Sequence, residues 1–490
     1  MYSNSVTARC LYYVCGNITF ILGLFITLFW KPLFYSSFNS DLRLTSGSQN
    51  HKVWTENTVP IYTKIYMFNW TNPEQTLSKS EKANFTEMGP YIFRYTMKKS
   101  DTVWNKNDTV TFNLDRIWDF VPEMSNGNLS DSVTNINAVA ISLGHRVKEF
   151  NSVGKLIMNQ ALRLIERQVY ITKSVEELLF EGYRDQLLSV IDIFKKLGIN
   201  TGSIPGRFGW YFNKNATADD RPIFNIHTGT DDLNLLGEVH SWNYKTECGV
   251  YSAQCDRVRG SLGDLWPKNA AEKQTASVFV PDFCGAIDLT KQGPRTLHGI
   301  ETVRFVSTEK TFDNGVKNPK NSCYSKNTTV SIPYGVRDLS ECVHGPIYAS
   351  FPHFYSADHT YRLDINGMNP VAAKHQFSIT LHKELGMLME ILGRLQINVK
   401  VEPYPGFGFF SDLPEIMVPT FWFEQYIEFP KDLEDQLTLL LNYAPILISL
   451  IGYVLIIAGV ILIIVGYYCT KYYRESESFD ELIFFDVLKR

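Results

Sequence analysis

A run of basic side chains between residues 155 and 167 has the residue types and spacing that best suit the binding of an anion. In KLIMNQALRLIERQVY, the residues Lys155, Asn159, Arg163 and Arg167 recur every four positions, which places them on one face of a helix. An arginine guanidinium binds carboxylate or phosphate through two parallel hydrogen bonds. Like charges at this spacing cost a few tenths of a kcal/mol, so the pattern is also typical of a solvated helix face. Both interpretations stay open.

The same run carries a second, apolar face. Ile157, Ala161, Ile165 and Val169 recur every four residues, which predicts an amphipathic helix from Lys155 to Val169. We place this helix inside a helical region that extends from about residue 137 to residue 196.

Catalytic chemistry has no comparable support. The sequence contains no H-E-x-x-H, G-x-S-x-G, P-loop or G-x-G-x-x-G motif, and Ser203 follows Gly202 one position too early for a nucleophile elbow. His353 and His359 have no carboxylate at metal-ligand spacing, so we interpret them as structural or surface histidines. We therefore expect no catalytic residue, no cofactor and no metal site, and a protein that is not an enzyme.

Cysteine placement divides the chain into two environments. One group falls within the central block: Cys248, Cys255, Cys284, Cys323 and Cys342. Its spacing lacks C-x-x-C pairs and indicates disulfides formed in an oxidising compartment, with one thiol left over. The other group, Cys10, Cys15 and Cys469, lies at the ends of apolar segments. These cysteines suit S-acylation, or are merely small apolar residues.

Glycosylation sequons agree with this division. The triplet N-x-S/T occurs in the central block at Asn69, Asn84, Asn107, Asn128, Asn215 and Asn327. Six such triplets favour a lumenal or extracellular location for this block. A further triplet at Asn17 lies in an apolar segment, where we expect it to stay unmodified.

Two apolar segments bound the central block. The first, Cys10 to Trp30, has 21 residues without charge and no A-x-A-like cleavage site, so we interpret it as a retained anchor rather than a cleaved leader. The second is centred on Pro445 to Tyr468, in a stretch without charge from residue 436 to residue 470. We expect a cytosolic tail at 1–9, a transmembrane helix at 10–30, a glycosylated ectodomain at 31–442, a transmembrane helix at 443–469 and a cytosolic tail at 470–490.

The central block has the composition of an ordered domain with a mainly antiparallel sheet. Aromatic residues make up 14% of the chain and charged residues 20%, and the net charge of −4 argues against a nucleic-acid partner. In PYIFRYTMK, Tyr91, Phe93, Tyr95 and Met97 alternate with other residues, as in a strand with one buried face. We predict strands at 58–70, 90–98, 108–120, 298–307, 374–385, 394–404 and 414–429, with Asn72-Pro73 and Gly89-Pro90 between the first of them. The predicted fold class is α+β, with the helical region as an insertion.

Five motifs, in order, carry a resemblance to a known family. They are TNPE at 71–74, GPY at 89–91, ELL running into GYRD at 177–185, PDFC at 281–284 and GPIYASFPHF at 345–354. The chain resembles the class B scavenger receptor family, which includes fatty-acid translocase, the lysosomal integral membrane proteins and the sensory neuron membrane proteins. The resemblance covers essentially the whole chain.

This resemblance implies a β-barrel-like ectodomain with a helical bundle at its tip and an internal hydrophobic tunnel toward the bilayer. It places Lys155, Arg163 and Arg167 at the tip, where basic residues serve some members for acidic ligands. It also implies the disulfides Cys255–Cys323 and Cys284–Cys342. Ser325 and Ser331 stand where vertebrate members have a third bridge, and Cys248 is additional.

The function that follows is a plasma-membrane receptor, with both termini cytosolic, that captures lipid, lipoprotein or anionic particles and passes lipid to the bilayer. One alternative is an endosomal, lysosomal or phagocytic receptor for a protein or apoptotic-cell cargo; the tail at 474–485 is a near match to an acidic dileucine signal. A two-span gated channel is disfavoured because Pro445 to Tyr468 offers no charged or amide side chain to a pore, and a nucleotidase because Gly-rich phosphate loops are missing. The sequence leaves homo-oligomerisation open.

Overall fold

The computed structural model describes residues 2–56, 59–147, 152–163, 169–188, 206–215, 221–325, 332–427 and 431–488. The chain forms two compact units. One comprises Met1–Asp41, Leu297–Ile300 and Pro430–Arg490, and the other comprises Leu42–Thr296 and Glu301–Phe429. Each is described by itself.

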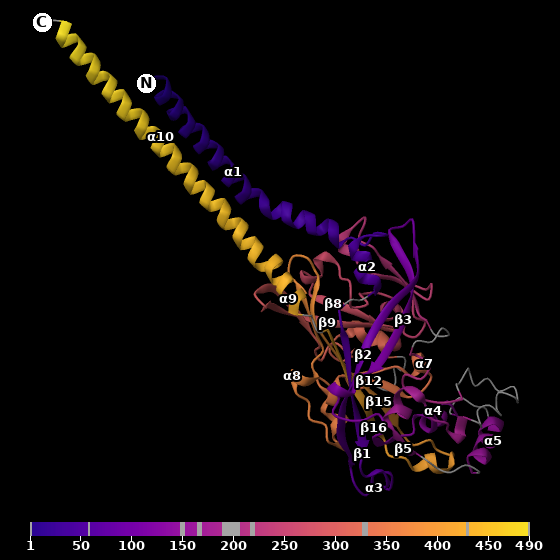
Figure 1. The fold of residues 1–490 in the computed structure, drawn as a ribbon. Coiled ribbons are helices and arrows are strands. Elements are labelled where there is room, and N and C mark those ends of the chain that lie inside the picture. The colour runs from indigo at the N-terminus through magenta and orange to yellow at the C-terminus, as the bar shows by residue number, and fades with distance from the viewer. Residues whose placement is uncertain are drawn as a thin grey trace. The chain divides into compact units, whose positions relative to one another are not determined.

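The first unit is a pair of long apolar helices. It contains α1 (Tyr2–Leu42), α9 (Lys431–Thr438), η11 (Leu439–Tyr443) and α10 (Ala444–Leu488). Helices α1 and α10 run side by side, with both chain termini at the same end of the pair (Figure 1). Two segments are apolar and long enough to cross a bilayer, Leu11–Leu42 and Asp435–Tyr472. The helices thus extend beyond the spans predicted at 10–30 and 443–469.

Glycines allow these helices to approach closely. A Cβ at Gly23 would lie 2.6 Å from the backbone N of Ile456, and a Cβ at Gly459 would lie 2.5 Å from that of Phe20. Because hydrocarbon offers no hydrophobic driving force between helices, their association depends on such close packing. Beside this seam lies an apolar cavity of about 300 Å³, lined by Phe25, Ile26, Trp30, Leu33, Ile448 and Ile451. This cavity is not the tunnel that the resemblance implies, which stays a prediction.

The second unit is built on a 14-stranded, mainly antiparallel sheet. Its strands are β1 (Ile61–Trp70), β2 (Ala83–Trp104), β3 (Thr109–Phe120), β6 (Ile223–His227), β7 (Val239–Trp242), β8 (Thr275–Val280), β9 (Gly285–Leu297), β10 (Ile300–Val306), β11 (Val336–Asp338), β12 (Ile347–Ser350), β13 (Ile365–Asn366), β14 (Ser378–His382), β15 (Leu388–Val401) and β16 (Ile416–Ile427). The main path runs β7-β6-β3-β2-β1-β16-β15-β14-β10-β9-β8. A separate pair joins β4 (Ser132–Ile136) to β5 (Tyr170–Ser174).

A short segment closes the sheet toward a barrel. The backbone N–H of Val239 in β7 donates to the carbonyl of Gly260 at 2.8 Å, and that of Phe279 in β8 donates to Ser261 at 2.8 Å. Residues 260–261 therefore bridge the two end strands of the path, and the end strands keep hydrogen-bond partners.

The register of β2 and β3 fixes which side chains face inward. Phe93 pairs with Phe120, Tyr95 with Trp118 and Met97 with Arg116. Directly opposite residues of an antiparallel pair share a face. The predicted alternation holds at Phe93 and Tyr95, which are buried, and at Arg94 between them, which is exposed. It fails at Ile92, which is 4% exposed, because both faces of the strand are covered there.

The predicted strands at 58–70, 108–120, 298–307, 374–385, 394–404 and 414–429 are all present. Two have wrong bounds: β15 begins at Leu388 rather than at 394, and residues 374–375 lie in a short helix before β14. The boundary placed at Gly89-Pro90 is wrong. The strand β2 continues through this dipeptide to residue 104 because Met88 and Tyr91 on either side still pair with β1. A register shift in β1 between Ile65 and Met67 accommodates it.

The helices of the second unit are short. They are α2 (Gln49–Glu56), α3 (Pro73–Leu77), α4 (Ala138–Val147), α5 (Ser152–Arg163), α7 (Ser340–Val343) and α8 (Ala372–His375). Single turns lie at η1 (Pro122–Met124), η2 (Glu177–Glu181), η3 (Leu233–Leu235), η4 (Ala253–Asp256), η5 (Lys268–Ala271), η6 (Pro281–Phe283), η7 (Pro319–Tyr324), η8 (Pro352–Phe354), η9 (His359–Arg362) and η10 (Gly408–Asp412).

The helix predicted from Lys155 to Val169 is wrong at its end. Val169 is buried and comes directly before β5, whose Tyr170 pairs with Ile136 of β4. The run Val169-Tyr170-Ile171-Thr172 is β-branched and aromatic, and pairing with β4 outweighs its helical periodicity. The helical region predicted at 137–196 is therefore interrupted by a strand.

Two apolar cores fill the second unit. The larger contains Phe93, Tyr95 and Trp118 together with side chains from β1, β15 and β16. The smaller contains Val110, Phe112 and Leu114 of β3, together with residues of β6, β7 and α2.

Candidate functional site

Aromatic side chains gather on the inner face of β2 and β3. The Trp118 ring lies 5.0 Å from Tyr95 and 5.3 Å from Tyr211, and the Tyr211 ring stacks on Phe180 at 5.3 Å between centroids. Tyr95 and Trp118 are buried, whereas Phe180 and Tyr211 keep part of their surface accessible. Such partly accessible rings are suited to contact an apolar ligand.

The segment 206–215 positions the Tyr211 ring against Trp118 and Phe180. The backbone N–H of Tyr211 donates to Leu179 at 2.7 Å, and Phe208 and Tyr183 exchange backbone hydrogen bonds. The Asn215 side chain accepts from the backbone N–H of Trp118 at 3.0 Å and donates to its carbonyl at 3.1 Å. The segment is thus fastened to β3 immediately beside Lys214.

A charged triad adjoins the aromatic group. Asp282, in η6, accepts from Arg116 of β3 at 2.8 Å and from Lys214 at 2.7 Å. Burial opposes ionisation of the carboxyl group, but the two cations outweigh it and hold the pKa of Asp282 well below its usual range. Asp282 is therefore ionised under physiological conditions.

A second triad, again of one carboxylate, one arginine and one lysine, lies on the opposite face of the sheet, as the register of β1, β2 and β3 shows. Glu424 of β16 pairs with Lys64 of β1 at 2.9 Å and with Arg394 of β15 at 2.6 Å. Glu424 is 9% exposed, against 37% for Asp282. The carboxylate of Glu424 is buried by its neighbours, whereas the carboxylate of Asp282 remains accessible.

One of two disulfides fixes the segment that carries Asp282, because Cys284 lies two residues after it. Cys284 bonds Cys342, and Cys255 bonds Cys323, the pairs that the resemblance implied. Cys248 is free, and burial together with nearby Asp256 raises the pKa of its thiol to about 12.

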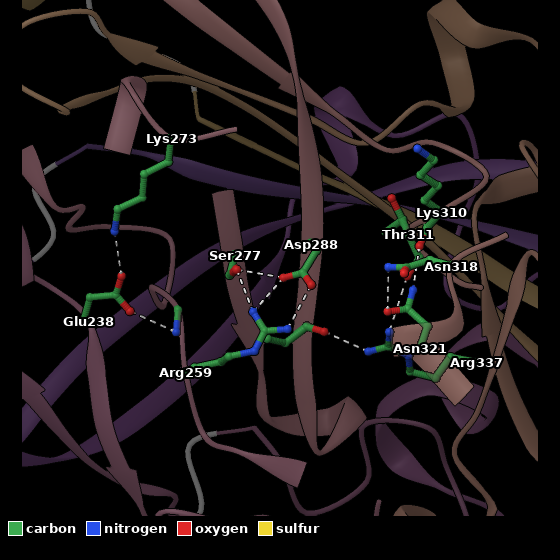
Figure 2. A network of polar contacts seen from close by, with 12 residues as sticks. Glu238, Arg259, Lys273, Ser277, Asp288, Lys310, Thr311, Asn318, Asn321 and Arg337 are labelled. Atoms are coloured by element: carbon green, nitrogen blue, oxygen red, sulfur yellow. Dashed lines mark hydrogen bonds and ion pairs between the residues drawn. The ribbon is translucent and has the colours of Figure 1, made fainter. Parts of the chain in front are cut away.

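Figure 2 shows a polar network around Arg259, Asp288 and Arg337. Arg259 donates to both carboxylate oxygens of Asp288, at 2.7 and 2.9 Å, and to Ser277 at 2.8 Å. The fully buried Arg337 donates to the carbonyl of Ala286 at 2.8 Å and stacks 3.6 Å from the Tyr324 ring. These contacts tie β8 and β9 to the disulfide-linked turns, so the network is structural.

The predicted basic stripe is only partly described. Lys155 is half-buried on α5, and the Asn159 side chain donates to the carbonyl of Gly406 at 2.7 Å. The Asn159 amide thus bonds a neighbouring loop, and Leu156, 61% exposed, faces solvent instead. The Arg163 side chain and the whole of Arg167 lie outside the described residues.

The sequons differ in access. Asn107 and Asn128 are exposed, and the sequon hydroxyls of Thr109 and Ser130 donate to their side-chain oxygens at 2.8 and 3.1 Å. The others that the structure describes, Asn69, Asn84 and Asn215, are half-buried, and Asn327 lies outside the described residues. Glycosylation at all six stays a prediction.

The remaining candidate residues are placed as follows. Cys15 is exposed on α1 and Cys469 is half-buried on α10, both as free thiols, and Cys10 lies in α1. His353 is buried with structural partners, and His359 is exposed beside Asp358. Among the described residues, no group of three His, Cys, Asp or Glu side chains is arranged to hold a metal ion.

A family model described as the CD36 family matches residues 14–470. The chain belongs to the CD36 family. The resemblance to class B scavenger receptors is therefore confirmed, as is the fold class, with two terminal apolar helices and a large antiparallel near-barrel. Membership supports a scavenger-type receptor that spans the membrane twice.

Curated relatives of this CD36-family chain come from several branches. It is 32% identical to Protein peste of Drosophila melanogaster, over 92% of this chain and 79% of that protein. It is 28% identical to scavenger receptor class B member 1 of Cricetulus griseus, over 84% and 79% respectively. It is 27% identical to lysosome membrane protein 2 of Homo sapiens, over 92% and 93%.

The triad around Asp282 was not found from the sequence. In the strand predicted at 108–120, the alternation of side chains places the charged Arg116 on the inward face. This inward charge was the one feature of the sequence that could have indicated the triad. Lys214 and Asp282 lie 68 residues apart, and nothing local links them.

Proposed function

We propose that this protein is a cell-surface receptor that captures lipid-bearing or anionic particles and passes lipid through its ectodomain into the bilayer. No covalent chemistry is required, and we infer that the protein is not an enzyme. An acyl chain in water costs about 0.8 kcal/mol per CH₂, so a dry path lowers the barrier to transfer.

The observation that carries the proposal is the partly accessible aromatic group inside a nearly closed sheet. Phe180 and Tyr211 project from segments packed on β3 and keep accessible surface although Trp118 beneath them is buried. Apolar side chains that stay accessible on the inner face of a sheet are the expected lining of a lipid path. The chain connects the ectodomain to both membrane helices, so lipid that leaves the path is delivered to the bilayer to which the protein is anchored.

Capture is assigned to the basic residues of the predicted tip. Arg163 and Arg167 would bind carboxylate or phosphate on a particle surface. Charge reversal at both, R163E/R167E, is expected to weaken binding of anionic liposomes and to leave binding of neutral liposomes unchanged at low salt. Equal binding of anionic liposomes by variant and wild type would reject this role.

Transfer is tested with the full-length chain reconstituted into liposomes. Donor vesicles carrying a fluorescent, self-quenched lipid are mixed with these liposomes, and dequenching reports arrival. We expect faster transfer than into protein-free liposomes, and a return to the protein-free rate when Phe180 and Tyr211 are replaced by charged residues. A rate independent of the protein would reject the proposal.

A second candidate is an endosomal or lysosomal receptor for a protein cargo. The observation that favours it is the similarity to lysosome membrane protein 2, over 93% of that protein's length. Surface biotinylation of cells that express the chain distinguishes the two: surface labelling supports the first candidate, and exclusive co-localisation with lysosomal markers supports the second.

A further inference from the structure

Arg116 occupies an unusual position, the junction between the two apolar cores. Along the inner face of β3, Leu114 belongs to the smaller core and Trp118 to the larger, and Arg116 lies between them. Its partner across the ladder, Met97, packs against both cores. A charge on an inner face is costly unless it is paired, so its presence there calls for a reason beyond packing.

The carboxylate that pairs with Arg116 is accessible although its surroundings are buried. Asp282 is 37% exposed, whereas the Arg116 side chain is 10% exposed and the adjacent Phe283 is 2% exposed. Lys214 is 29% exposed on the other side of the carboxylate. The two accessible charges therefore face space beside buried side chains, rather than a packed interior.

The chemistry at this place favours an anion. Two cations against one carboxylate leave a net positive charge, and the Lys214 ammonium has three N–H groups, of which one bonds Asp282. The Tyr211 hydroxyl is near the triad, and burial raises its pKa, so the phenol stays protonated and can donate. Phe180 and Tyr211 supply accessible apolar surface, and both pack on Trp118, whose ring lies 5.7 Å from the Arg116 guanidinium carbon.

We propose that Lys214 and Arg116 bind the anionic head of an amphiphile, a carboxylate or phosphate monoester, while its hydrocarbon tail lies against Phe180 and Tyr211. Asp282 positions both cations and is not itself a ligand. The inference rests on the proposed passage of lipid through the ectodomain, and adds that this passage selects by head-group charge.

The chain offers a matched control for the test. Lys64 is 28% exposed and pairs with Glu424, which also bonds Arg394, just as Lys214 pairs with a carboxylate that also bonds an arginine. The two triads differ in that Glu424 is buried. Substitution of either lysine by methionine removes one charge from a triad of the same composition. A purely structural role predicts similar effects for K214M and K64M.

The test measures binding of two fluorescent lipids to the full-length chain in nanodiscs. The lipids are cis-parinaric acid and its uncharged methyl ester, and energy transfer from tryptophan reports binding. We expect K214M to weaken acid binding about tenfold, or about 1.4 kcal/mol, and to leave ester binding unchanged. K214R should keep acid binding, and K64M should change neither.

Several results would overturn the inference. The first is equal binding of the acid by K214M and the wild type. The second is a loss of both acid and ester binding in a K214M protein that melts at the wild-type temperature. The third is that acetate or inorganic phosphate displaces the acid as effectively as oleate does. If the wild type binds neither lipid, the proposed function fails as well. If it binds both equally in all variants, only the charge selection fails.

Discussion

The Nε2 atom of His353 lies 2.8 Å from Oε2 of Glu87, although the two residues are 266 positions apart in the chain. The indole N–H of Trp422 donates to the same oxygen at 2.7 Å, and the Nδ1 atom of His353 accepts the backbone N–H of Asn369 at 3.0 Å. Because Nδ1 is an acceptor, Nε2 carries the proton and donates to Glu87. This contact joins β2, β16 and η8.

The Glu87 carboxylate stabilises this junction. Burial raises its pKa, but hydrogen bonds from His353 and Trp422 outweigh burial and hold the pKa of Glu87 below its usual value. At neutral pH, Glu87→Gln replaces two charge-assisted hydrogen bonds and should lower the free energy of unfolding by about 1.5 to 3 kcal/mol, measured by denaturant titration. The matched control is Glu301→Gln, in an exposed pair with Lys383, for which we expect less than about 1 kcal/mol. Equal effects would contradict this account.

Two buried histidines predict loss of stability on acidification. Burial, with His353 adding to it, lowers the pKa of His375 to about 4, and burial lowers that of His382 to about 4. Between pH 6.5 and pH 4, these two histidines bind more protons in the unfolded chain than in the folded chain. The free energy of unfolding therefore decreases as the pH falls through this range. Each contributes about 1.4 kcal/mol per pH unit.

The variant that checks this is His382→Asn, whose amide oxygen can take the place of Nδ1 as acceptor for the backbone N–H groups of Glu384 and Leu385. Melting temperature measured across the acidic range should depend less steeply on pH in the variant. A wild-type protein that becomes more stable on acidification would refute the assignment.

The sequence predicts the fold well where one face of a strand is buried. Phe93 and Tyr95 are buried on either side of the exposed Arg94, as the alternation predicts, although Ile92 is buried as well. Prediction fails where a short run of residues is compatible with both helical and strand periodicity. Val169 fits the apolar face of the predicted helix and also lies directly before β5. The pairing of β5 with β4 is what ends the helix before this residue. The candidate site is less accessible to sequence reasoning, because Arg116 and Asp282 are 166 residues apart and meet only in the closed sheet.

The free thiol of Cys248 should not exchange with the two disulfides of the ectodomain. With a thiol pKa of about 12, Cys248 has little thiolate near neutral pH. Iodoacetamide should therefore label Cys248 poorly in the folded protein, and Cys248→Ser should leave both disulfides intact in peptide mapping. Replacement of Cys284 and Cys342 by alanine should cost about 2 to 5 kcal/mol. Scrambled disulfides in the wild type would contradict this assignment.

The helix seam predicts a position-dependent effect of alanine. At Gly459 a Cβ would meet the backbone of Phe20 at 2.5 Å, whereas at Gly466 it would meet only side-chain atoms of Tyr12 and Tyr13 at 3.4 Å. Gly459→Ala should lower the melting temperature in detergent, and Gly466→Ala should not. Identical melting of the two variants would show that the helices do not pack along this seam.

Glycan mapping tests the side of the membrane. Enzymatic deglycosylation in heavy-oxygen water should mark Asn107 and Asn128, whose side chains are exposed in turns, and leave Asn17 in α1 unmarked. Modification of none of the sequons would contradict a lumenal or extracellular ectodomain.

Photocrosslinking with a diazirine-bearing acyl lipid tests the passage of lipid most directly. The full-length chain is loaded from donor vesicles, irradiated and digested, and the adducts are mapped by mass spectrometry. We predict adducts on the peptides that carry Phe180 and Tyr211, in addition to those expected on α1 and α10 from surrounding bilayer lipid. Adducts confined to α1 and α10 would contradict the proposal that lipid moves through the ectodomain.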